Sequence, residues 1–190
     1  MTSIDDNKDQ IAIHCESSLQ NYDQIVICAG AWSKQLALMI GDNFPLDTER
    51  GYHVLFENIE QLIDRPIGWS KFGFYIIQIE EGIRSAGTVE IAGLNNKPNQ
   101  KRLKMIEKET RKLLPSLGQV KSTWLGFRPT LPDAMPVIGP SKKNKKIFYA
   151  FGHQHIGWTL AAVTGKSIQH MLDDSKPNFD LSAFSPNRFF

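Results

Sequence analysis

The chain has 190 residues, of which 41% are hydrophobic and 10% aromatic, so it can bury a core and is not globally disordered. Its 22 Lys and Arg residues against 20 Asp and Glu residues leave a formal charge of +2, too small to favour nucleic acid as a partner. The length suggests one domain or two small ones. Two cysteines make no disulfide framework, and no apolar stretch reaches the ~20 residues of a spanning helix, so we expect a cytoplasmic protein.

The first third of the chain predicts a strand followed by a helix. Apolar residues alternate with polar or small ones over 11–15, and a turn is expected over 16–21. The unbroken apolar run over 25–29 is typical of a strand buried on both faces, as in a parallel sheet flanked by helices. A helix is expected over 31–40, and Gly41 can end it in the left-handed conformation.

The middle of the chain is rich in strands. The pattern predicts strands over 52–56, 74–79, 83–91 and 120–127, and a charged amphipathic helix over 101–114. The short glycine-bearing link between the second and third of these strands predicts an antiparallel hairpin.

The last third of the chain again predicts a strand followed by a helix. A short apolar strand is expected over 147–151 and a helix over 159–172. Because α/β character lies at both ends, we expect one layer built from 1–43 and 135–190, with a second layer inserted over 44–134.

The commonest nucleotide-binding motifs do not occur in this sequence. No two of the 14 glycines are separated by a single residue, which excludes the GxGxxG fingerprint. Residues 165–167 resemble the end of a phosphate loop, but Leu160 replaces its first glycine inside an expected helix. His153 and His155 could form a metal pair, although the favoured interpretation is a turn that contacts a ligand at a helix N-terminus. We therefore assign no metal.

Four other features leave two interpretations open. The basic run 142–146 is favoured as a solvated hairpin loop, the alternative being attraction to the anionic inner face of a membrane. Arg128, fixed before a proline, could clamp a carboxylate with two hydrogen bonds or make a structural ion pair. Tyr52 and His53 lie within an apolar strand. Considered one at a time, each is more typical of a core residue with satisfied hydrogen bonds than of a ligand-binding residue.

Five segments in a fixed order carry a family resemblance. They are YDQIVICAGAWS (22–33), RGYHV (50–54), GIRSAGTVEIAG (82–93), WLGFRPTLPDAMPVIGPS (124–141) and YAFGHQHIGWTLAAVTGKSI (149–168). Together they resemble the C-terminal half of D-amino-acid dehydrogenases, within the superfamily of FAD-dependent D-amino-acid oxidase and glycine oxidase. The fold implied is mixed α/β, with part of a Rossmann-like FAD-binding domain (1–43 and 135–190) and a substrate domain with a mixed, largely antiparallel sheet (44–134).

The resemblance also implies roles for particular residues. Arg128 would bind the substrate carboxylate, and Tyr52 and His53 would face the substrate side of the flavin. The implied FAD-binding residues are Ala29, Gly30, Ala31, Trp32, Gly152, His153, Gln154, His155, Ile156, Gly157, Trp158 and Thr159. Gln154 departs from the family, which usually has a small residue there, and a positive φ would strain it.

The chemistry implied is the oxidation of a D-amino acid at its C–N bond. A hydride passes from Cα to flavin N5, and the imino acid hydrolyses to a 2-oxo acid and ammonia, without a catalytic triad of protein residues. The dehydrogenase resemblance implies a quinone as electron acceptor. Because the family's glycine-rich FAD loop is absent here, an N-terminal FAD-binding half or a second subunit would complete the site, and this chain alone is expected to be inactive. The alternatives are an oxidase of glycine, sarcosine or another secondary amine, and a partner subunit or scaffold without catalysis.

Overall fold

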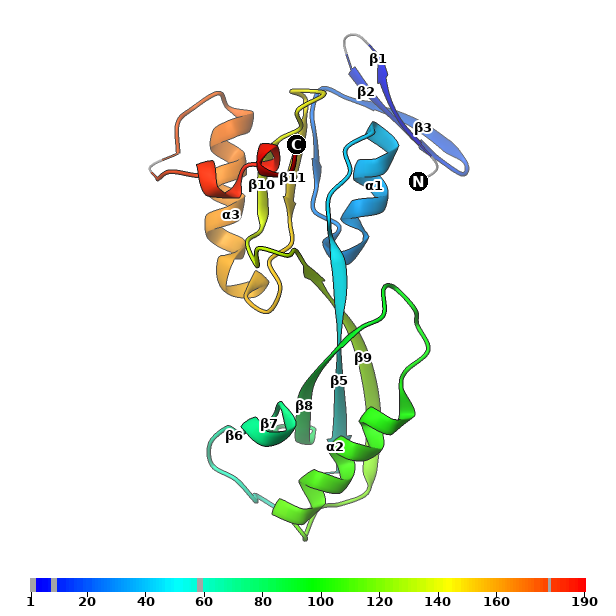
Figure 1. The fold of residues 1–190 in the computed structure, drawn as a ribbon, viewed down its shortest axis with the longest axis vertical. Helices are drawn as coiled ribbons and strands as arrows, with labels where there is room; N and C mark the ends of the chain where they lie inside the picture. The colour runs from blue at the N-terminus through cyan, green and yellow to red at the C-terminus, as the bar shows by residue number, and fades with distance from the viewer. Residues whose placement is uncertain (1–2, 8–9, 58–59, 178) are drawn as a thin grey trace. The chain divides into compact units, whose positions relative to one another are not determined.

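The computed structural model describes residues 3–7, 10–57, 60–177 and 179–190 and divides the chain into two compact units (Figure 1). The terminal unit comprises Met1–Asp47 and Arg128–Phe190, and the inserted unit comprises Thr48–Phe127. The sequence predicted an inserted layer over 44–134, and the inserted unit of the structure covers Thr48–Phe127. The binding role of each unit stays a prediction.

The terminal unit contains a three-stranded sheet covered on both faces. Its strands lie in the order β10-β11-β4, and β11 pairs antiparallel with β10 and parallel with β4. Helix α1 packs against β4 and helix α3 against β10. The parallel pair predicted from the apolar run over 25–29 is thus confirmed. The elements are β4 (Ile25–Ile27), α1 (Ser33–Ile40), β10 (Val137–Pro140), β11 (Ile147–Phe151) and α3 (Gly157–Leu172).

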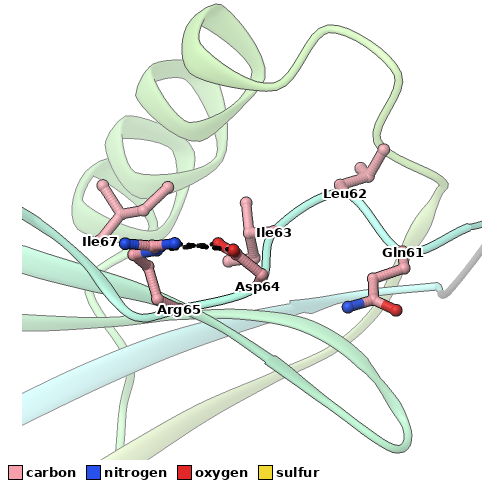
Figure 2. Close-up of a pocket in the computed structure, with 6 residues that line it drawn as sticks. All are labelled: Gln61, Leu62, Ile63, Asp64, Arg65 and Ile67. Carbon is pink, nitrogen blue, oxygen red and sulfur yellow. Dashed lines mark hydrogen bonds and ion pairs between the residues drawn. The ribbon is translucent and has the colours of Figure 1, made fainter.

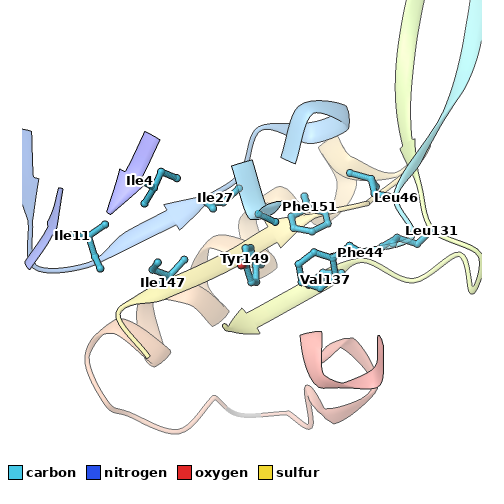
Figure 3. Packing of buried hydrophobic residues seen from close by; sticks show 11 residues of the cluster. Ile4, Ile11, Ile27, Phe44, Leu46, Leu131, Val137, Ile147, Tyr149 and Phe151 are labelled. Atoms are coloured by element: carbon cyan, nitrogen blue, oxygen red, sulfur yellow. The ribbon is translucent and has the colours of Figure 1, made fainter. Parts of the chain in front are cut away.

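Alternation along β10 and β11 divides the core between the two faces. Tyr149 and Phe151 pack on one face with Phe44 (Figure 3) and belong to the same cluster as Ala37 of α1, whereas Phe148 packs on the other face with Ile168 of α3. Gly41 ends α1 with a φ of 85°, as predicted. Residues 165–167 lie inside α3, which excludes a phosphate loop, and the basic run 142–146 forms the hairpin loop between β10 and β11.

The N-terminal residues form a second, antiparallel sheet in the terminal unit. Its strands are β1 (Ser3–Asn7), β2 (Gln10–Cys15) and β3 (Ser18–Tyr22). The expectation of a turn over 16–21 was wrong, because the turn is confined to residues 16 and 17. Every residue of β3 is exposed, so its sequence shows no alternation of buried apolar and exposed polar residues. The strand is held by its antiparallel backbone pairing with β2.

The inserted unit is a five-stranded sheet with one helix on one face. Strands lie in the order β6-β7-β8-β5-β9, and β7 and β8 form the predicted hairpin. Leu103 and Ile106 of α2 are buried against the sheet, whereas Leu113 is 42% exposed. None of the described helices is long and apolar enough to span a membrane. The elements are β5 (Asp47–Phe56), β6 (Ile67–Trp69), β7 (Phe74–Ile79), β8 (Gly82–Ile91), α2 (Gln100–Leu113) and β9 (Val120–Thr130).

Candidate functional site

Two loops of the terminal unit meet at one edge of its sheet. The parallel register pairs Ile25 with Ile147 and Ile27 with Tyr149, so the carboxyl ends of β4 and β11 lie side by side. The chain continues from β4 into residues 29–32 and from β11 into residues that lead to α3. Ligands of open α/β sheets bind at this edge. The structure therefore brings together the two segments that the sequence predicted to bind FAD.

The loop after β4 is an open backbone turn. Gly30 has a φ of 55°, and a Cβ built there would meet nothing within 4 Å. The N–H of Trp32 donates to the carbonyl of Ala29 at 3.0 Å, Ala31 is buried, and the indole of Trp32 is 49% exposed. The glycine is thus required by backbone conformation, and the space above it is open to a ligand.

The loop after β11 contains two left-handed residues. Gly152 has a φ of 86°, and a Cβ there would lie 2.5 Å from Cδ1 of Leu131. Gln154 has a φ of 48°, which is the strained conformation anticipated for this departure from the family. Its N–H donates to the carbonyl of Pro129 at 3.2 Å, so the loop is tied to the segment that follows Arg128.

The two histidines of this loop have different environments. His153 is half-buried, its Nε2 lies 3.0 Å from Oγ1 of Thr164, and burial lowers its pKa, so the ring is neutral at pH 7. His155 is exposed. Among the described residues, no group of three or more His, Cys, Asp and Glu side chains could hold a metal ion.

Helix α3 begins at the same edge without a side-chain cap. Its N-cap residue, Ile156, accepts only a backbone bond, from the N–H of Leu160 at 3.0 Å. Ile156 and Trp158 are exposed by 53% and 97%. The first amides of Gly157–Thr159, with the partial positive charge of a helix start, are placed to receive an electron-rich group.

Arg128 lies on strand β9, half-buried. Because side chains alternate along a strand, Trp124, Gly126 and Arg128 share one face of β9. The Trp124 ring folds over Gly126, where a Cβ would lie 1.8 Å from the indole, and it stacks on His53 at 5.3 Å and 15°.

Within the inserted unit, His53 and Tyr52 point to opposite faces of the sheet. Burial and the positive charge of Arg84 lower the pKa of His53, which is neutral at pH 7. Tyr52 is 1% exposed on the face covered by α2, where its hydroxyl donates to Glu90. The geometry favours a core role for Tyr52, and its contact with substrate stays a prediction.

A buried polar network surrounds the Tyr52 hydroxyl. Arg50 donates to it at 3.0 Å and also to Glu90, whose other oxygen accepts from Nδ2 of Asn99 at 2.8 Å. The hydrogen bonds that Glu90 accepts from Tyr52, Asn99 and Arg50 lower its pKa to about 2. Sequence reasoning missed Glu90 and also Trp124, although the glycine two residues beyond Trp124 was a usable signal for a ring lying on the strand.

A separate hollow of about 540 Å³ lies beside a loop of the inserted unit (Figure 2). An exposed ion pair between Asp64 and Arg65, at 2.8 Å, lies at this hollow. It is lined by Gln61, Leu62, Ile63, Asp64, Arg65 and Ile67, and by none of the predicted site residues.

Solved structures show the same arrangement of elements. Glycine oxidase from Geobacillus kaustophilus matches 98% of this chain and 51% of its own, with a TM-score of 0.88 and 20% identity. L-proline dehydrogenase from P. horikoshii matches 99% of this chain and 53% of its own, with a TM-score of 0.84 and 20% identity. The chain thus has the fold of the matching parts of these two structures, and the predicted mixed α/β fold is confirmed.

The sequence then places the chain in a family. Residues 1–171 match the DAO family of FAD dependent oxidoreductases, and the chain belongs to this family, as its five segments predicted. It is 40% identical over 185 residues to D-amino-acid oxidase of Bradyrhizobium diazoefficiens, covering 94% of this chain and 44% of that protein. It is 29% identical over 167 residues to glycine oxidase of Pseudomonas putida, covering 86% and 45%. The chain thus spans less than half the length of these relatives.

Proposed function

We propose that this chain is the C-terminal part of an FAD-dependent oxidoreductase that oxidises the C–N bond of D-amino acids to a 2-oxo acid and ammonia. The observation that carries the proposal is the meeting of residues 29–32 and 152–159 at the carboxyl edge of the parallel pair β4 and β11. FAD, when bound, supplies the acceptor for the hydride that leaves Cα.

The residues at this edge fit a flat, electron-rich ring. The open space at Gly30 permits close approach of the ring to the backbone. At Gly152 the absence of a Cβ lets the second loop pack closely on Leu131. The uncapped amides of α3 would bind the pyrimidine edge of the flavin, where negative charge accumulates on reduction. Trp32 and Trp158 have indoles exposed at the same edge, and they would exclude water from the ring.

The substrate would be held by its carboxylate. Arg128 has the planar fork that binds a carboxylate with two parallel hydrogen bonds. The family resemblance implies that His53 would face the substrate, and its ring stacks on that of Trp124. Because His53 is neutral, it would add no second positive charge to compete for the carboxylate.

A second polypeptide segment would complete the flavin site, as an N-terminal FAD-binding half or a second subunit. Strand β4 is an edge of the described sheet, and it carries apolar side chains without the charges that usually block strand addition. An apolar groove of about 220 Å³ lies beside it, lined by Ile4, Ile13, Ile25, Val26, Ile27, Cys28, Ala29 and Leu36. A further apolar strand fits this edge.

Flavin binding tests the proposal directly. FAD is titrated into the 190-residue chain alone and then with the flavin-binding half supplied as a separate polypeptide, with flavin fluorescence as the readout. We expect tight, saturable binding only with both. Submicromolar binding by the chain alone would show that a glycine-rich loop is dispensable, and absence of binding in both cases would favour a scaffold.

The substrate and the electron acceptor are decided on the assembled enzyme. We expect D-amino acids to be oxidised with a quinone analogue as acceptor. The alternative, an oxidase of glycine, sarcosine or another secondary amine, is supported by the similarity to glycine oxidase. Turnover of those amines with release of hydrogen peroxide, and none of D-amino acids, would favour it.

A further inference from the structure

The C-terminal segment of the terminal unit folds back onto the residues that follow Arg128. Arg188, 16% exposed, pairs with Asp133 through Nε at 2.6 Å and Nη2 at 3.4 Å. Its Nη2 also donates to the carbonyl of Met135 at 2.7 Å, and its Nη1 donates to those of Phe184 at 2.9 Å and Ser185 at 3.1 Å. One guanidinium therefore joins two segments distant in the sequence.

The segment that Arg188 holds is a strained turn. Ala134 has a φ of 60°, a left-handed conformation that costs a residue with a Cβ about 1–2 kcal/mol. The turn is closed by the N–H of Ala134 on the carbonyl of Leu131 at 3.0 Å and by that of Met135 on Oδ1 of Asp133 at 3.1 Å. Asp133 thus serves both the turn and Arg188, which lowers its pKa by hydrogen bonding.

The same turn is joined to both parts of the candidate site in the terminal unit. Leu131, 1% exposed, lies three residues after Arg128 and supports Gly152 so closely that a Cβ there would lie 2.5 Å from it. The carbonyl of Pro129 accepts the N–H of Gln154 at 3.2 Å. A shift of the turn would therefore be transmitted to the end of β9 and to the loop after β11.

The tail that carries Arg188 is itself fixed in the core. The rings of Phe189 and Phe190 pack edge-on against Phe44 at 6.2 Å and 5.3 Å, and the Arg188 guanidinium lies 4.3 Å over the Phe189 ring. Arg188 thus lies on a tail whose aromatic rings pack against Phe44 of the core.

We propose that Arg188 is a positioning residue, which holds the turn Leu131–Met135 and thereby aims Arg128 at the substrate carboxylate. The inference rests on the role proposed above for Arg128. This role differs from that of a simple anchor for the tail, because loss of Arg188 must then alter the structure around Arg128 and Gln154 and not only around residues 182–190.

Amide hydrogen exchange on the 190-residue chain tests the holding role without any activity. Arg188→Ala is expected to speed exchange about tenfold or more at the amides of Ala134, Met135 and Gln154. Arg188→Lys keeps the charge but cannot reach Asp133 and the three carbonyls together, so it is expected to be intermediate.

Arg111 provides the matched control for this measurement. Its guanidinium also pairs with a carboxylate, Glu107 at 3.1 Å, donates to the carbonyls of Leu117 and Gly118, and lies over a phenylalanine ring. Arg111→Ala is expected to leave exchange at Ala134 and Gln154 unchanged. If Arg188→Ala speeds exchange only within residues 182–190, Arg188 anchors the tail alone and the proposal is wrong.

Kinetics on the assembled, flavin-loaded enzyme test the consequence for the substrate. Arg188→Ala should raise KM about tenfold with kcat changed less than about threefold, because carboxylate binding is weakened before the chemical step. Arg188→Lys should recover part of this loss, and Arg111→Ala should alter neither constant. An unchanged KM in Arg188→Ala overturns the inference. If Arg128→Ala itself leaves KM unchanged, the carboxylate-binding role proposed for Arg128 fails instead, while exchange at Gln154 still decides whether Arg188 holds the turn.

Discussion

The two units place their candidate residues on different kinds of structure. In the terminal unit the predicted flavin-binding residues lie on loops at the carboxyl ends of the parallel pair β4 and β11, and they depend on backbone conformation at Gly30, Gly152 and Gln154. In the inserted unit the candidate residues lie on the face of an antiparallel sheet, where His53 stacks on Trp124. Under the proposed function, the cofactor common to the family would depend on backbone geometry, and the variable part of the substrate would depend on side chains.

Removal of Arg128 is expected to have the largest effect on activity. Loss of one partner of a buried charged pair costs about 2–5 kcal/mol, so Arg128→Ala should lower kcat/KM of the assembled enzyme by about 30- to several-thousand-fold. Arg128→Lys should restore only part, because an ammonium lacks the fork geometry. Arg84→Ala is the control, and a greater loss there would move the carboxylate site to the inserted unit.

The buried network of the inserted unit predicts an acid-sensitive stability. Because the folded-state pKa of Glu90 is lowered to about 2, its contribution is complete above the ordinary value of 4.5 and is lost as the pH falls toward 2. Glu90→Gln should lower the free energy of unfolding at pH 7 by about 3 kcal/mol and flatten this acid dependence. Glu107→Gln, a helix-surface pair, should cost less than about 1 kcal/mol. Equal losses in urea unfolding of the two variants would contradict the network's role.

The strained residue of the terminal unit should be relieved by glycine. Gln154→Gly removes the Cβ from a left-handed residue and should raise the free energy of unfolding by up to about 1 kcal/mol, measured by thermal unfolding. Gln154→Ala keeps the Cβ and should give no gain. A destabilised Gln154→Gly would mean that the glutamine side chain contributes more than its backbone costs.

The smallest expected effect concerns the protonation of His53. Trp124→Ala uncovers the imidazole, so its pKa should rise toward the ordinary value of 6.5, as followed by NMR titration. Tyr75→Ala removes another exposed aromatic ring of the inserted unit and should leave that titration unchanged. If the pKa of His53 falls or stays constant without Trp124, the positive charge of Arg84 rather than burial governs it.

Much of this architecture could be predicted from local patterns. The apolar run before Gly30 and the periodic residues of α2 each report burial through their spacing, and they gave a strand and a helix within a few residues of the observed bounds. Strand β3 could not be found in this way, because all its side chains are exposed and only its partner defines it. The family resemblance supplied the loops of the terminal unit, whose pairing at one edge follows from parallel strands.

The details of the site depended on information that no local pattern contains. Tyr52 and His53 are adjacent in the sequence, and alternation predicts that they face opposite sides, but only the position of α2 decides which side is covered. Arg188 and Asp133 are separated by more than fifty residues, so their pairing required the path of the whole terminal unit. Long-range polar contacts of this kind are set by tertiary structure alone.

The way in which the chain enters and leaves the inserted unit makes that unit exchangeable. Strands β5 and β9, which begin and end it, are neighbours in one sheet, so its two ends are held close together by their own hydrogen bonds. The entropic penalty of closing an insertion grows only with the logarithm of its length, and ends that are already joined reduce it further. The whole inserted unit could therefore be transplanted between relatives at residues 47/48 and 127/128, with residues 29–32 and 152–159 left untouched.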